Sequence, residues 1–70
     1  NKMATKKLDL HKMTHEEAQR QVENFILLND PPLSIITGNS DRMREIVTYL
    51  CAKHKISYER WDWGEITILK

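Results

Sequence analysis

Two helical segments, each preceded by a short aliphatic run, constrain the fold of this chain most. The first segment begins at Thr14-His-Glu-Glu17, a capping box in which the Thr14 hydroxyl can accept from the Glu17 amide. Its apolar residues recur at helical spacing, at Ala18, Val22, Phe25 and Ile26. Asn29-Asp-Pro-Pro32 ends the helix, because proline disfavours helical geometry in the residue before it.

The second helix follows the β-branched run 33–37, which predicts a buried strand. Gly38, Asn39 and Ser40 predict a turn and a helix cap. The helix then extends to about residues 54–55, with an apolar stripe at Met43, Ile46, Val47 and Leu50.

Three further short segments predict strands. Residues 8–11 alternate aliphatic and polar side chains, and residues 57–61 and 65–69 pair most simply as a hairpin around Asp62-Trp63-Gly64. The order β-α-β-α-β-β predicts an α/β two-layer sandwich, with a mixed four-stranded sheet and right-handed crossovers. Two such crossovers in succession place both helices on one face of the sheet.

Length and composition favour one small domain. Seventy residues, 40% of them hydrophobic and 30% charged, fit a single globular unit over residues 8–70, preceded by a basic arm or linker over 1–7. The chain begins with Asn, which we interpret as a domain taken from a longer protein. A net charge of +1 argues neither for nor against nucleic acid, and the clustered lysines could bind phosphate or only keep the domain in solution.

A single cysteine, Cys51, excludes an internal disulfide and indicates a cytoplasmic or other intracellular reducing compartment. The sequence contains neither an apolar run of about 20 residues, as a membrane span requires, nor a signal peptide.

The predicted topology brings two loops to the carboxyl ends of the parallel strands, where ligands bind in such sheets. One loop is 11–14 and the other is 37–40, so Asp9 and His11 are expected near the start of the second helix. Backbone amides, the helix dipole and Gly38 at that start favour an anion such as phosphate. The hydroxyls of Thr37 and Ser40 and the charge of Arg42 would add to the site, and Arg44 could contribute charge as well.

Asp9 can orient His11 as a general acid or base. Alternatively, His11 only ends the strand and bonds a backbone carbonyl. A metal site from Asp9, His11 and His15 has no recognised spacing, so we predict no cofactor and leave metal dependence open. Trp61 and Trp63 could stack on unpaired bases or cover the edge of the core.

The stretch LDLHKMTHEEAQ resembles the opening of the Smr (small MutS-related) domain, whose motif is LDLHG followed by a T-x-x-E-A helix start. Residues that match are Leu8, Asp9, Leu10, His11, Met13, Thr14, Glu17 and Ala18. The family's second motif, HGxG or TGxG, corresponds to Thr37 and Gly38 in IITGNSDRMREIVTYL, and EITILK is similar to the final strand. The resemblance covers residues 8–70.

The resemblance implies a nucleic-acid-binding domain with the fold of the C-terminal domain of bacterial translation initiation factor three. Several family members nick DNA or cut RNA, which implies catalytic roles for Asp9 and His11. It also implies nucleic-acid or phosphate contacts, to which the loops would contribute Lys12, Thr37, Gly38, Asn39, Ser40 and Arg42. Two residues depart from the motifs: Lys12 and Ser40 stand where the family has glycine.

Three interpretations follow. The domain is an endonuclease acting on DNA or RNA, a nucleic-acid-binding module without catalysis, or a protein-interaction module of a larger protein or complex. The sequence favours nucleic-acid binding. It leaves open whether the domain is also an endonuclease.

Overall fold

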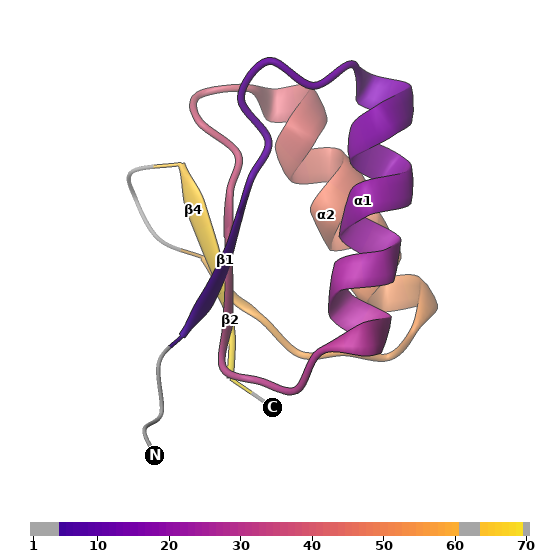
Figure 1. Ribbon diagram of the computed structural model, residues 1–70, viewed down its shortest axis with the longest axis vertical. Coiled ribbons are helices and arrows are strands. Elements are labelled where there is room, and N and C mark those ends of the chain that lie inside the picture. Colours follow the sequence, from indigo (N-terminus) through magenta and orange to yellow (C-terminus); the bar gives the residue numbers. More distant parts are fainter. Residues whose placement is uncertain (1–4, 61–63, 70) are drawn as a thin grey trace.

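The computed structural model describes residues 5–60 and 64–69 (Figure 1). Its elements follow the order β1 (Lys6–Asp9), α1 (His15–Leu28), β2 (Leu33–Ile36), α2 (Asp41–Lys53), β3 (Glu59–Arg60) and β4 (Glu65–Ile68). Both helices lie on the same face of the sheet, so the molecule has two layers (Figure 1).

The two helices begin where the capping residues predict. The Thr14 hydroxyl accepts from the Glu17 amide at 3.0 Å, and the Ser40 hydroxyl accepts from the Met43 amide at 3.1 Å. Each cap satisfies one of the backbone donors that a helix start leaves without a partner. Both predicted caps are confirmed.

The sheet is mixed. β1 runs parallel to β2, and β4 runs antiparallel to β2, which gives the order β1-β2-β4-β3. Alternate residues of β2 and β4 face the helices and fill the core, because successive side chains of a strand point to opposite faces. The core consists of Leu10, Ala18, Val22, Ile26, Leu33, Ile35, Met43, Ile46, Val47, Leu50, Cys51, Ile66 and Ile68.

The predicted four-stranded sheet is wrong in its third strand. The prediction is a strand paired along residues 57–61; among the described residues 57–60 of this segment, Glu59 and Arg60 alone pair, with Thr67 and Ile66 of β4. Residues 57–59 are exposed, so these three residues bury no side chain that would hold them against the sheet. The fold is β-α-β-α-β: a three-stranded mixed sheet of β1, β2 and β4, with β3 as a two-residue pairing at one edge.

Strand boundaries also differ from the prediction at β1, which covers Lys6–Asp9 instead of 8–11. Lys6 and Lys7 of the expected basic arm therefore belong to the sheet, while residues 1–4 lie outside the described residues. The expected turn at Asp62 and Trp63 lies outside them too. Within residues 5–60 and 64–69, neither helix has the length and apolar character needed to cross a bilayer.

Candidate nucleic-acid interface

The loops that follow β1 and β2 meet at one edge of the sheet. His11 lies beside Gly38: a Cβ atom added to Gly38 would lie 3.1 Å from His11 Nε2. The parallel pairing of β1 with β2 produces this contact, because it brings the carboxyl ends of both strands to the same edge. We call the surface formed by residues 9–14 and 37–40 the loop rim.

Asp9 contacts His11 at two places, the backbone amide and the imidazole ring. Its Oδ1 atom accepts from the His11 backbone amide at 2.9 Å and lies 2.8 Å from His11 Nδ1. This local turn explains why β1 stops at Asp9, since short acidic side chains favour turns by bonding the backbone two residues on. Leu10 points into the core, where it is 1% exposed, and its amide still donates to Ile36 at 2.9 Å.

The same contacts determine the charge of Asp9 and which ring nitrogen of a neutral His11 carries the proton. Donation from the His11 amide, with smaller contributions from the imidazole, holds the pKa of Asp9 below its ordinary value, so the carboxylate is ionised at neutral pH. Because a carboxylate only accepts, we assign the imidazole proton to Nδ1. A neutral His11 ring therefore carries its lone pair on Nε2, the atom that lies against Gly38. Both side chains are 62% exposed, so solvent and ligands can reach them.

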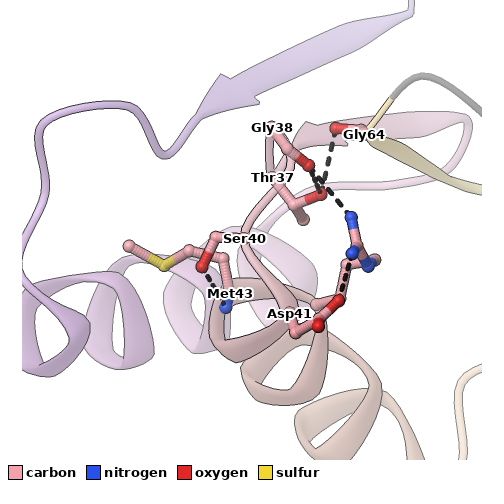
Figure 2. Close-up of polar contacts among 7 residues, drawn as sticks. Thr37, Gly38, Ser40, Asp41, Met43 and Gly64 are labelled. Atoms are coloured by element: carbon pink, nitrogen blue, oxygen red, sulfur yellow. Dashed lines mark hydrogen bonds and ion pairs between the residues drawn. The ribbon is translucent and has the colours of Figure 1, made fainter.

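The second loop is held by a network of internal bonds (Figure 2). Thr37 is buried, and its hydroxyl lies 3.0 Å from the Gly64 carbonyl oxygen and 3.1 Å from that of Gly38. The same Gly64 oxygen accepts from the amides of Thr37 and Gly38. The Thr37 hydroxyl thus serves the internal structure of the loop.

The first turn of α2 adds a further contact to this network. Arg44 donates from Nη1 to the Gly38 carbonyl at 3.1 Å, and its Nη2 atom pairs with Asp41. The guanidinium of Arg44 is thus engaged within the protein, and it ties α2 to the loop that precedes it. Sequence reasoning treated Arg44 only as a source of charge, because the pattern does not show which carbonyl it would reach.

The remaining predicted site residues lie on or beside the loop rim. Lys12 and Asn39 are exposed, and Lys12 has a left-handed backbone with φ of 67°. Ser40 caps α2. Arg42 is 63% exposed and lies 3.5 Å from Glu45. It lines a groove of about 380 Å³ together with Gln19, Glu45, Ile46 and Tyr49, between the two helices.

Metal ligands do not gather at the loop rim. Among residues 5–60 and 64–69, no three side chains of the His, Cys, Asp and Glu types lie close enough together to hold an ion. Asp9 and His11 thus form a pair without His15. Trp61 and Trp63 lie outside the described residues.

Gly64 is the residue of this region that the sequence did not single out. Its only signal there is its place as the glycine of the predicted hairpin turn Asp62-Trp63-Gly64. Its contact with Gly38 is long-range, and neither residue lies in a segment whose periodicity could reveal it.

No protein-family model, no curated protein and no solved structure matches this chain.

Proposed function

We propose that this chain is a nucleic-acid-binding domain similar to Smr domains, and that the loop rim contacts the phosphates of DNA or RNA. The polar and cationic contacts come from Lys12, Asn39, Ser40 and Arg42. Thr37 and Gly38 form the part of the loop rim that supports these side chains. The resemblance of LDLHKMTHEEAQ to the Smr opening motif supports the assignment to nucleic acid.

The observation that carries the catalytic part of the proposal is the orientation of His11. The Asp9 Oδ1 atom lies 2.8 Å from Nδ1 of His11, while Nε2 of the same ring lies at the loop rim against Gly38. A histidine held in this way by a carboxylate is suited to general acid–base catalysis. The proposed reaction is phosphodiester cleavage, the activity of several Smr proteins.

In this reaction, Nε2 takes a proton from the attacking hydroxyl, which belongs to water or to the ribose 2′ position. The hydroxyl oxygen bonds to phosphorus, and the bond between phosphorus and the leaving oxygen breaks with its electron pair. The leaving oxygen then takes a proton from solvent. Lys12 and Arg42 stabilise the charge that grows on the phosphate oxygens.

A second candidate function is nucleic-acid binding without catalysis. It is favoured by the exposure of Asp9 and His11, 62% for each side chain, because electrostatic stabilisation of a transition state is strongest where water is excluded. Under this alternative, the same residues grip phosphate and contribute affinity to a larger protein or complex. A reducing intracellular compartment suits both functions, since Cys51 is a free, buried thiol.

The test is an incubation of wild-type protein with branched DNA and with structured RNA, with and without chelator. The His11→Ala variant should cleave about 100-fold more slowly or worse, because it lacks the proton acceptor. His15→Ala is the control, since His15 is an exposed histidine in the first turn of α1. Unchanged cleavage by His11→Ala would remove the imidazole from the mechanism.

Binding is measured in parallel as a function of salt. Each phosphate contact releases about one counterion, so affinity should fall steeply as salt is raised. Salt-dependent binding without cleavage by the wild type would establish the second candidate. Failure to bind either nucleic acid at low salt would refute both.

A further inference from the structure

The two glycines of this chain, Gly38 and Gly64, lie against each other. A Cβ atom added to Gly64 would lie 2.4 Å from the Gly38 carbonyl oxygen and 2.8 Å from its Cα atom. Both residues also have positive φ angles, 65° and 71°, which residues other than glycine rarely adopt. The contact therefore requires glycine at position 64 for two separate reasons.

Hydrogen bonds fix Gly38 from both sides. The Gly64 carbonyl accepts from the amides of Thr37 and Gly38, at 2.7 and 3.0 Å. The Gly38 carbonyl accepts from Arg44 at 3.1 Å (Figure 2). Both polar groups of the Gly38 backbone thus have partners within the protein, and its Cα position is fixed relative to β4 and α2.

The His11 ring lies on the side of Gly38 where a side chain would project if the residue were not glycine. All three atoms nearest to an added Gly38 Cβ belong to the His11 ring, with Nε2 closest at 3.1 Å. The His11 imidazole thus lies against Gly38, and Gly38 in turn lies against Gly64. The position of Nε2 depends on where the backbone of Gly38 is held.

We propose that Gly64 is a positioning residue for the His11 site: its carbonyl holds the 37–38 backbone as the surface against which the imidazole rests. This inference rests on the proposed function for its catalytic consequence. A displaced Gly38 backbone would change where Nε2 lies relative to a phosphate at the loop rim. Misplacement by about 1 Å can reduce an enzymatic rate on the order of 100-fold.

The experiment compares variants by NMR signals of the His11 ring, which report its position whether or not the domain cleaves nucleic acid. Gly64→Ala should shift these signals, because the added methyl group forces the Gly38 backbone to move. Thr37→Val should shift them without adding bulk, since it removes the hydroxyl donor only. The conservative Thr37→Ser should restore them. The control is Ile66→Val, which removes one buried methyl group from the core close to Gly64 in β4 and leaves the Gly64 and Thr37 hydrogen bonds in place.

Cleavage and binding of structured RNA and branched DNA are measured on the same variants. Shifted ring signals in Gly64→Ala and Thr37→Val, with Ile66→Val unchanged, support the inference. If the wild type cleaves, a rate loss in the same two variants supports it further. If the wild type neither binds nor cleaves, the shifted signals still support the positioning, and the proposed function alone fails.

Folded variants whose His11 signals match the wild type would overturn the inference. Where Gly64→Ala does not fold, Thr37→Val decides. The wild type supplies an independent check: nuclear Overhauser contacts are expected between the His11 ring and the Gly38 Cα protons, and between the Cα protons of the two glycines. Their absence would also overturn it.

Discussion

Lys12 shows how one residue combines a structural cost with a functional gain. Its φ of 67° is in the left-handed region, which glycine adopts without strain and other residues do not. Lys12 therefore adopts this conformation at a cost, and it adds an exposed charged side chain to the loop rim. Under the proposed function, that charge is a phosphate contact at the loop rim.

Replacing Lys12 with glycine should therefore stabilise the domain and weaken its binding to nucleic acid. The gain in unfolding free energy should be about 1 kcal/mol, from relief of the left-handed conformation. The plot of log affinity against log salt should lose about one unit of slope. Urea unfolding and salt-dependent binding measure the two effects.

Lys12→Ala separates the two contributions, because it removes the charge and keeps a side chain in the left-handed conformation. It should weaken binding as Lys12→Gly does, without the gain in stability. Equal stability of the glycine and alanine variants would contradict the strain argument.

At the scale of elements, α1 and α2 are joined at the C-terminal end of α2 by polar contacts as well as by the core. His54, the residue that caps α2, places Nε2 2.7 Å from Glu23 Oε2 of α1, and Lys53 Nζ lies 3.4 Å from the same oxygen. The hydrogen bond from His54 is the main cause that holds the pKa of Glu23 below its ordinary value of 4.5. The folded domain thus favours the ionised form of Glu23.

This contact should make stability sensitive to acid. A carboxyl group whose pKa is lowered by folding stabilises the folded state above its ordinary value of 4.5, and that contribution is lost as the pH falls through the lowered pKa. Urea unfolding of wild type and Glu23→Gln from neutral to acidic pH measures it. The difference between the two proteins should shrink as the pH falls, and a constant difference would contradict the prediction.

The sequence predicted the elements to different degrees. Thr14 and Ser40 mark both helix starts correctly, because a cap depends on residues within one turn of it. The parallel order of the first two strands likewise predicts that the loops after them meet, with His11 near the start of α2, and His11 does lie beside Gly38 in the loop before that helix. The prediction of a full strand over 57–61 is wrong, because a hairpin pattern produces a strand only where side chains pack against the sheet, and Tyr58 and Glu59 are exposed. The contact of Gly64 with Gly38 depends on the tertiary fold and left no local pattern.

The whole molecule depends on a small core. Typical domains have 0.05–0.15 kcal/mol of stability per residue, which is about 4–10 kcal/mol for 70 residues. Ile35 lies in the central part of this core: it is 0% exposed, and β2 separates β1 from β4. A single large cavity at Ile35 should remove much of the total unfolding free energy.

Ile35→Ala should lower the unfolding free energy by about 2–5 kcal/mol, from lost burial and the cavity left behind. The control Gln21→Ala, on the exposed face of α1, should change it by less than about 0.5 kcal/mol. Urea unfolding monitored by circular dichroism measures both. A similar small effect of the two substitutions would mean that the core packs differently from the structure described.

The position of Gly64 has a consequence for when, during synthesis, the loop rim can form. The carbonyl that holds Thr37 and Gly38 immediately precedes β4, the strand that pairs with β2. A ribosome releases the imidazole and the start of α2 long before it releases residues 64–68. A nascent chain therefore exposes both loops before the oxygen that joins them is available, and the loop rim is complete only after translation has passed this strand.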